Sequence, residues 1–288
     1  MNNKLLTYEE SVNWLRSQPQ HFELVELCYL DRDNLAAAKR FASSEEFTEV
    51  MKVLHIDKLQ KKLKILDIGC GNGIASYAFA SLGHEVCAID PDISEDVGLG
   101  ATKKLASVIS NGSISTHQAF AESLPFEDAT FDIIYARQAL HHFTDLYTGL
   151  AECSRVLKPK GLLLATREHV VNNNEQLKTF LDEHLLQKLH EGENAYPLKN
   201  YLSAIEQSGI TVLNLLAPFD TVINHFPVSN LEINNSLVEK LSRKVGRPVA
   251  KAISKLSFIE RIYRYSLSKK CNSPGRLYSF YGSKQEIK

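Results

Sequence analysis

Hydrophobic residues follow two successive patterns along this chain of 288 residues. Over the first sixty residues apolar side chains recur at helical spacing, as in Glu9–Arg16 and Glu45–Leu54, without any strand pattern. From residue 64 to about residue 170, short apolar runs alternate with amphipathic segments. Such alternation is typical of a parallel sheet whose strands are connected by crossover helices.

The apolar runs set the expected order of elements. Strands are expected at Lys64–Ile68, Glu85–Ile89, Ile114–Gln118, Phe131–Ala136, Gly161–Thr166, Thr211–Leu216 and Arg276–Tyr281. Helices are expected at Ile74–Leu82, Ser94–Ile109, Thr148–Val156, Glu175–Leu189 and Leu198–Ser208. Leu157–Gly161 contains a proline and a glycine, which predict a helix end and a turn before the fifth strand.

These elements divide the chain into four expected parts. Residues 1–60 form an N-terminal helical cap over the ligand face, and residues 61–219 form the α/β core. Residues 220–274 form a helical insertion or lid, and residues 275–288 return to the core as its last strand.

Charge is unevenly distributed, although the formal net charge of the chain is only −1. Between Glu239 and Arg276 eleven Lys or Arg face two Glu, which leaves 22 basic against 32 acidic residues elsewhere. An apolar stripe runs through the same segment, at Leu237, Leu241, Val245, Val249, Ile253 and Leu256. Two interpretations stay open: burial of this stripe against the core, or a lid or membrane-surface helix that receives an anionic or lipid-linked substrate.

Neither a membrane span nor a secretion signal is expected from the sequence. No apolar stretch approaches eighteen residues, and Met1–Lys4 opens no signal peptide, so a cytoplasmic location is expected. The five cysteines show no C-x-x-C spacing, which favours buried free thiols over disulfides or a zinc framework.

The first strand leads into the most informative segment of the chain, the glycine loop of residues 69–73. Glycines at positions 69, 71 and 73 allow a sharp turn into a helix and let a ligand lie against bare backbone. Asp67 would repel a phosphate there and favour a cation. A dinucleotide fingerprint would need glycine at position 74, where this chain has Ile74. Asp90, which follows the second strand, can accept hydrogen bonds from both hydroxyls of a ribose.

Three further motifs follow in order: Ala121–Phe126, Phe131–Ile134 with Ala139–Phe143, and Arg155–Gly161. Together with the glycine loop they resemble the type 11 branch of the class I S-adenosylmethionine-dependent methyltransferases. The resemblance implies a Rossmann-like fold: a seven-stranded, mostly parallel sheet with helices on both faces and an antiparallel last strand. It also implies S-adenosylmethionine as cofactor and S-adenosylhomocysteine as its product.

The resemblance assigns cofactor roles to particular residues. The glycine loop would pass under the methionine and ribose, Asp90 would hold the ribose, and Ala121 with Glu122 would border the adenine. Phe120 stands where the family usually has an acid, and it would offer a stacking surface instead. The expected cofactor-binding set is Asp67, Gly69, Gly71, Gly73, Asp90, Phe120, Ala121, Glu122 and Arg137.

Histidines after the fourth and fifth strands are the candidates for catalysis. His141, His142 and His169 should face the cofactor, and a neutral imidazole can deprotonate a hydroxyl acceptor. The alternative for His141 and His142 is a structural role at a helix start. A metal is not expected, because no third ligand occurs at a diagnostic spacing from the adjacent histidines.

The expected acceptor is a small molecule methylated at oxygen. The segment after the fourth strand differs from the Asn-Pro-Pro-aromatic loop typical of enzymes that methylate bases, which disfavours a nucleic-acid substrate. The layout R-E-H, G-E-N-A-Y and V-I-N resembles methyltransferases of bacterial surface-polysaccharide pathways and suggests a sugar or sugar conjugate. Two alternatives remain: a non-catalytic cofactor-binding partner protein, and an enzyme that uses another nucleoside cofactor. The oligomeric state is not predicted.

Overall fold

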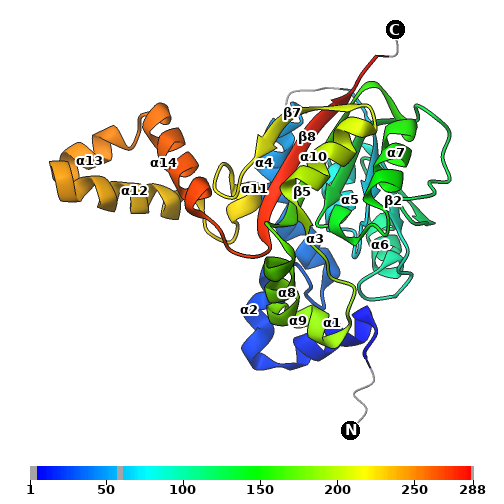
Figure 1. Cartoon of the computed structure of the whole chain (residues 1–288). Coiled ribbons are helices and arrows are strands. Elements are labelled where there is room, and N and C mark those ends of the chain that lie inside the picture. Colours follow the sequence, from blue (N-terminus) through cyan, green and yellow to red (C-terminus); the bar gives the residue numbers. More distant parts are fainter. Residues whose placement is uncertain (1–4, 57–60, 287–288) are drawn as a thin grey trace.

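The computed structural model describes residues 5–56 and 61–286 and has an eight-stranded sheet at its centre (Figure 1). The strands are β1 (Lys64–Ile68), β2 (Glu85–Asp90), β3 (Ser113–Gln118), β4 (Phe131–Arg137), β5 (Leu157–Val171), β6 (Tyr196–Pro197), β7 (Ile210–Leu216) and β8 (Arg276–Lys284). Seven follow the order β3-β2-β1-β4-β5-β8-β7, and the short β6 pairs with β5 outside that path. Only β8 runs antiparallel to its neighbours among the described strands. The predicted mostly parallel sheet with an antiparallel last strand is confirmed, and β6 is an addition to it.

Helices cover both faces of this sheet, which explains why β1 is buried at four successive positions instead of alternating. The helices are α1 (Tyr8–Ser17), α2 (Phe22–Leu27), α3 (Asn34–Ala42), α4 (Glu45–Val53), α5 (Ile74–Ser81), α6 (Leu99–Ala106), α7 (Leu146–Val156), α8 (Asn174–Glu183), α9 (Leu185–Leu189), α10 (Leu198–Gln207), α11 (Val222–His225), α12 (Asn230–Val245), α13 (Arg247–Ile253) and α14 (Ser257–Lys270).

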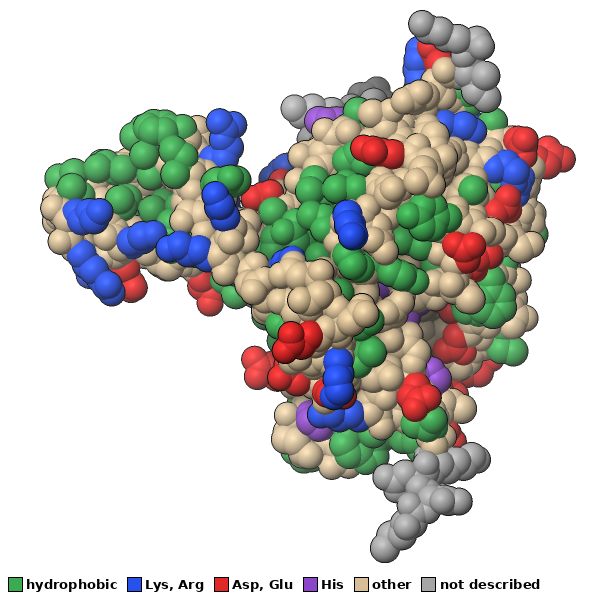
Figure 2. Space-filling model, viewed as in Figure 1, with side chains coloured by type: hydrophobic (Ala, Val, Ile, Leu, Met, Phe, Trp, Pro, Cys, Tyr) green, Lys and Arg blue, Asp and Glu red, His purple; other side chains and the backbone are tan. Residues whose placement is uncertain are grey.

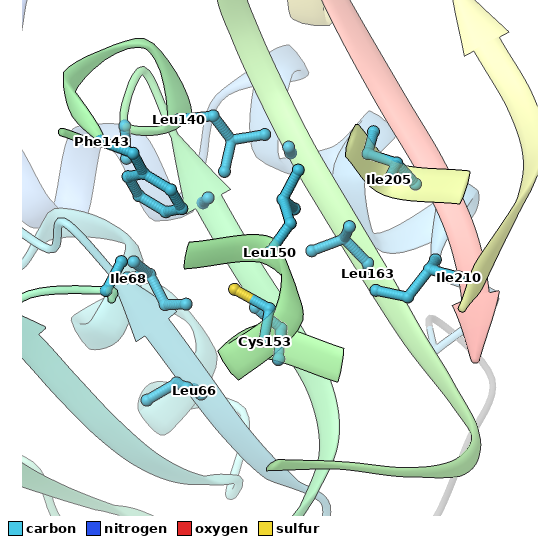
Figure 3. Packing of buried hydrophobic residues seen from close by; sticks show 14 of the residues in the cluster. Leu66, Ile68, Leu140, Phe143, Leu150, Cys153, Leu163, Ile205 and Ile210 are labelled. Atoms are coloured by element: carbon cyan, nitrogen blue, oxygen red, sulfur yellow. The ribbon is translucent and has the colours of Figure 1, made fainter. Parts of the chain in front are cut away.

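One face of the sheet packs against α7 and α10. Figure 3 shows Leu150 and Cys153 of α7 near Leu163 of β5, with Ile205 of α10 beside Ile210 of β7. The opposite face packs against α3, α4, α5 and α11 in a second buried cluster. The carboxyl ends of the parallel strands are left as the place where side chains from several loops meet.

The N-terminal helices occupy two places instead of forming one cap. α3 and α4 belong to the layer on the sheet, where Phe41 and Val50 are fully buried. α1 and α2 instead pack with α9 in a separate small cluster that includes Val12 and Leu186. Ser44 caps α4 by accepting a hydrogen bond from the Phe47 amide. The predicted boundary at residue 60 lies outside the described residues.

Three predicted elements have different bounds in the structure. α6 begins at Leu99 and not at Ser94, because the Asp92 carboxylate accepts hydrogen bonds from the Ser94 amide and hydroxyl and holds a turn. The predicted helix over 175–189 is interrupted at His184, which adopts extended backbone angles. The helix end predicted at residues 157–161 is confirmed, since α7 ends at Val156. β5 already begins at Leu157, but residues 158–161 leave the pairing with β4, and Lys160 has φ +63°.

The chain between β7 and β8 forms an arm of helices α12, α13 and α14 that projects from the core (Figure 1). Ile233 and Leu237 of α12 are buried, but they belong to neither large core cluster. The predicted apolar stripe is only partly covered, since Val245, Val249 and Leu256 are 43%, 50% and 47% exposed. Burial of the whole stripe against the core is therefore wrong.

The cysteines are free thiols, and three of the five are buried, as predicted. Within residues 5–56 and 61–286, no helix is both long and apolar enough to cross a membrane.

Candidate functional site

A cavity of about 850 Å³ lies at the carboxyl ends of β1, β2, β4 and β5. Tyr8 of the N-terminal region and Leu186 of α9 line it from the other side, and so do residues 190–193 of the loop before β6. This volume falls within the range of small-molecule sites. Every residue predicted to bind the cofactor or to take part in catalysis lines this cavity, except Gly73.

The glycine loop connects β1 to α5 along the floor of the cavity. Gly69 has φ +65°, and a Cβ atom there would lie 2.7 Å from the Cβ of Ala139. Gly73 has φ +81° and precedes α5, where a Cβ atom would lie 2.6 Å from the Thr102 hydroxyl. Both positions need glycine for conformation and for space. Gly73 therefore has a structural role in the turn and does not contact the cavity.

Asp90 links the glycine loop to the end of β2. Its Oδ2 accepts a hydrogen bond from the Gly71 amide and its Oδ1 accepts one from the Asp92 amide, both at 2.9 Å. Burial raises the pKa of Asp90 above its ordinary value. Each oxygen has a further lone pair, so the carboxylate can still accept from two ligand hydroxyls.

Asp67 is buried beneath the loop with 1% of its surface exposed. The Ser76 hydroxyl of α5 donates to its Oδ2 at 2.6 Å. Burial raises the pKa of Asp67 to about 7, and the hydrogen bond from Ser76 opposes that rise. A cationic ligand in the cavity would favour the ionised form of this carboxyl.

One wall of the cavity is formed by residues 120–122. Phe120 is 62% exposed at the rim, which leaves its ring free to stack on a ligand, and Ala121 is buried beside it. Glu122 accepts a hydrogen bond from the Asp145 amide through Oε1 at 3.1 Å. That bond orients the carboxylate at the start of α7.

The guanidinium of Arg137 is occupied by a buried partner. Its Nε and Nη2 donate to the two oxygens of Glu46 at 2.8 and 3.1 Å, and the Glu46 side chain has no exposed surface. The same guanidinium lies over the rings of Tyr29 and Phe41. The ion pair with Glu46 already uses the charge of Arg137 to connect α4 to the end of β4. Binding of the cofactor by Arg137 stays a prediction.

His141 is fixed in the cavity wall by Glu168, a residue that the sequence reasoning did not single out for a role. The Glu168 carboxylate is fully buried and accepts hydrogen bonds from the amides of Ala139, Leu140 and His141, each at 3.1 Å. It also lies 2.7 Å from His141 Nδ1. Because a carboxylate only accepts, Nδ1 carries the proton and His141 Nε2 carries the lone pair. Burial holds the pKa of His141 well below its ordinary value.

His142 and His169 are oriented in the same way by backbone carbonyls. His142 Nδ1 lies 3.0 Å from the Gly192 carbonyl oxygen, and His169 Nδ1 lies 2.8 Å from that of Gly275. Each ring therefore donates from Nδ1 and keeps a free lone pair on Nε2. Burial lowers the pKa of His169 to about 3, whereas His142 is exposed to solvent.

Two further ionisable residues line the cavity without having been predicted as site residues. Glu193 lies in the polar loop before β6, and His184 lies where α8 ends and α9 begins. The bulge in β5 also matters, because Arg167 has φ +60° and the pairing with β8 shifts between Ala165 and Glu168. The sequence signals for Glu193 are the density of polar residues in its loop and its place in the G-E-N-A-Y layout.

Comparisons with known proteins agree with this architecture. Residues 66–165 match the family model of the type 11 methyltransferase domain. The chain is 32% identical over 151 residues to the uncharacterized methyltransferase YcgJ of Bacillus subtilis, covering 50% of this chain and 54% of YcgJ. It is 26% identical over 191 residues to a ubiquinone biosynthesis O-methyltransferase of Rhizobium leguminosarum, covering 64% of this chain and 74% of that protein. The sequence match thus spans about half the length of YcgJ.

Solved structures resemble it over most of its length. The crystal structure of YcgJ matches with a TM-score of 0.53 at 20% identity, covering 84% of this chain and 99% of that one. Phosphoethanolamine N-methyltransferase 2 of Haemonchus contortus, in complex with S-adenosylmethionine, matches with a TM-score of 0.55 at 15% identity. That match covers 98% of this chain and 61% of the other. At such identities the likeness shows the fold alone.

Proposed function

This chain contains a class I methyltransferase domain of the type 11 branch, and we propose that it methylates an oxygen of a small-molecule acceptor with S-adenosylmethionine. The observation that carries the proposal is the single cavity in which the glycine loop and Asp90 face three histidines with defined lone pairs. One part of the cavity suits a nucleoside cofactor, and the other suits an acceptor that must lose a proton.

The cavity floor fits S-adenosylmethionine in shape and charge. The backbone at Gly69 and Gly71 offers a surface without side chains, and Asp90 offers two acceptors for the ribose hydroxyls. Phe120 offers an exposed ring for the adenine. When bound, the cofactor supplies a methyl group on a positively charged sulfur. Asp67 and Asp90 provide negative charge below that part of the site.

His142 is the residue best suited to remove the acceptor's proton. Its Nδ1–H is held by the Gly192 carbonyl, so Nε2 can take the proton as the acceptor oxygen forms its bond to the methyl carbon. The carbon–sulfur bond breaks with its electron pair on sulfur, and S-adenosylhomocysteine is released. His169 is less suited as the base, because a pKa of about 3 makes its imidazole a weak proton acceptor.

The polar lining of the cavity favours transfer over cofactor binding alone. A protein that only binds the cofactor needs no polar groups beside the methyl group, yet His141, His142, His169 and Glu193 all line this cavity. The name of the Rhizobium relative, an O-methyltransferase, supports oxygen as the methylated atom. A sugar or sugar conjugate remains our proposal for the acceptor, and it rests on the sequence layout described above.

The arm is proposed to bring the protein to a negatively charged lipid surface. Leu231, Phe258, Ile262 and Tyr265 are more than 50% exposed there, and Figure 2 shows hydrophobic and basic side chains next to one another over this region. Apolar side chains bordered by Lys and Arg are typical of peripheral membrane contact. No residue of the arm lines the cavity, among the residues described, so the predicted lid over the site is not supported.

The proposal is tested by incubating the protein with S-adenosylmethionine labelled in its methyl group and with sugar, phenolic and carboxylate acceptors. We expect one acceptor class to gain the label, with S-adenosylhomocysteine formed in equal amount. Calorimetry should show binding of both forms of the cofactor. Binding without product from any acceptor class would instead favour the non-catalytic alternative.

A further inference from the structure

Three ionisable side chains from distant parts of the sequence meet at one end of the cavity. His141 follows β4, His169 lies in β5, and Glu193 lies in the loop before β6. Each residue has one nitrogen or oxygen atom able to bind a metal, and these three atoms lie within 4.8 Å of one another. The rings of His141 and His169 are 4.8 Å apart at an interplanar angle of 72°. Removal of the acceptor's proton is assigned to His142, so none of these three side chains has a specific task in the transfer.

Both histidines make the outer hydrogen bond that metal-binding histidines usually make. His141 donates its Nδ1–H to the Glu168 carboxylate, and His169 donates its Nδ1–H to the Gly275 carbonyl. Such bonds fix the tautomer and ring orientation, and they leave Nε2 unprotonated. A carboxylate behind one histidine and a carbonyl behind the other are common outer partners of metal ligands.

The Glu193 carboxylate lies near His141 and His184 without a hydrogen bond to either ring. Its Oε2 lies 3.9 Å from His141 Nε2, and its Oε1 lies 3.7 Å from His184 Nδ1. Both distances are too long for hydrogen bonds. Two ligands bound at about 2.0–2.1 Å to a tetrahedral metal lie about 3.3 Å from each other. The distances from Glu193 to the two rings are therefore closer to the distance between two ligands of one metal than to the length of a hydrogen bond.

His184 gives an independent indication of a missing partner. Its Nδ1 is buried and has no hydrogen-bond partner among the described residues. Buried polar atoms of side chains are nearly always paired, so an unpaired ring nitrogen that faces a carboxylate needs an explanation. A metal on Glu193 would satisfy this nitrogen as a fourth ligand.

We propose that His141, His169 and Glu193 form a binding site for a divalent transition metal of the Zn²⁺ class, with His184 able to complete it. Imidazole nitrogens favour Zn²⁺ over Mg²⁺ or Ca²⁺, which prefer oxygen ligands. The ligands need to approach one another by about 1 Å, and Glu193 lies in a loop, positioned by the bond from its amide to Gln187. With three protein ligands the fourth position is open to the cavity; with His184 bound, the site is closed and structural.

The open form would act on the proposed acceptor, and this part of the inference rests on the proposed function. A metal at this position would polarise the acceptor oxygen and lower the pKa of its hydroxyl, so that His142 could take the proton more easily. His141 and His169 would then be ligands and not bases.

The test uses metal-free protein, prepared by dialysis against a chelator, and Co²⁺ as a visible stand-in for Zn²⁺. We expect one Co²⁺ per chain, with the intense visible absorption of a tetrahedral site and displacement by Zn²⁺. Glu193→Ala should weaken binding at least tenfold. Glu168→Gln, which removes the charge behind His141, should weaken it about 10–100-fold. The matched control His190→Ala, another histidine of the cavity wall, should bind like the wild type.

Two controls separate loss of the metal site from unfolding and from loss of cofactor binding. Thermal unfolding of each variant shows that it is folded, and Glu193 is chosen because its loop can lose a side chain without opening the core. Calorimetry with S-adenosylmethionine on the metal-free protein tests cofactor binding separately, so failure of the metal site is distinguishable from failure of the proposed function. Absence of Co²⁺ binding by the wild type, or equal binding by Glu193→Ala, would overturn the metal site and leave a water-bridged network.

Discussion

In the cavity, Asp67 and Glu168 are buried almost completely and each has specific hydrogen-bond donors. In the arm, Leu231 and Ile262 are 65% and 62% exposed. Figure 2 shows hydrophobic and basic side chains next to one another over the arm. The first region places polar groups where water is scarce, and the second places apolar groups in water. Polar groups are usually exposed and apolar groups are usually buried, so both regions depart from the usual distribution. Each therefore requires a binding partner.

The cavity and the arm differ in the size of the effect expected from substituting one residue. A buried carboxylate has a defined set of donors, so a single substitution leaves donors unpaired or removes a charge at the site. An exposed basic and apolar surface acts through summed charge and area, so each residue contributes a small, nearly additive share. Single substitutions in the cavity should therefore have larger effects than single substitutions in the arm.

Substitution of His142 should have the largest effect on activity. If its Nε2 removes the acceptor's proton, His142→Ala should lower turnover by about 10²–10⁴-fold and leave cofactor affinity nearly unchanged. Steady-state rates with the acceptor found in the labelling experiment measure the first effect, and calorimetry measures the second. A loss below about fivefold would mean that positioning alone activates the acceptor.

Asp67 should make stability depend on pH. Its pKa is raised from an ordinary value of 3.8 to about 7 in the folded protein, so the folded state holds the proton more tightly. Stability should therefore fall as pH rises from about 4 to 7, by about 4 kcal/mol, since one pKa unit corresponds to about 1.4 kcal/mol. Asp67→Asn has no such proton, so the difference in unfolding free energy between the two proteins isolates this effect.

Urea unfolding at a series of pH values measures that difference. The titrations of His141 and His169 occur in both proteins and cancel when one curve is subtracted from the other. A difference curve that stays flat between pH 4 and 7 would contradict the assignment of a raised pKa to Asp67.

Substitution of Asp90 should weaken cofactor binding. Asp90→Ala removes two charge-assisted hydrogen bonds to the ribose, and we expect a loss of about 1.5–3 kcal/mol in binding free energy. Calorimetry with S-adenosylhomocysteine measures it without turnover. Because Asp90 also accepts from the Gly71 amide, circular dichroism must confirm that the variant is folded. Unchanged affinity in a folded variant would remove Asp90 from the site.

The sequence predicts the cofactor half of the cavity much better than the acceptor half. Asp67, the glycine loop and Asp90 lie within a few residues of strand ends, and local pattern is sufficient to place them. Glu193 reaches His141 only because the chain breaks at His184, and Glu168 reaches it only because β5 bulges at Arg167. No periodic pattern indicates either irregularity, so the sequence offered no third ligand beside the histidines.

The arm shows a different limit of sequence reasoning. Its apolar stripe correctly indicates helices with one apolar side, since Leu237 is buried within the arm. Periodicity does not indicate what covers the remaining apolar positions, and Val249 and Leu256 remain half exposed. Helix α3 lies within residues 1–60, which the sequence predicts to be helical, but the prediction gives it no bounds of its own.

Single charges of the arm should have the smallest effect of the series. Each Lys or Arg near an anionic lipid surface contributes about 1 kcal/mol, so Lys251→Gln should weaken partitioning onto phosphatidylglycerol-containing vesicles about fivefold. Combined reversal of Lys244, Arg247 and Lys251 to Glu should abolish it, and raised salt should weaken the wild type. Lys103→Gln on α6 of the core is the matched control and should sediment with vesicles like the wild type. Equal sedimentation of the triple variant would mean that the basic residues of the arm only face solvent, and the arm would then need a protein partner for its exposed apolar side chains.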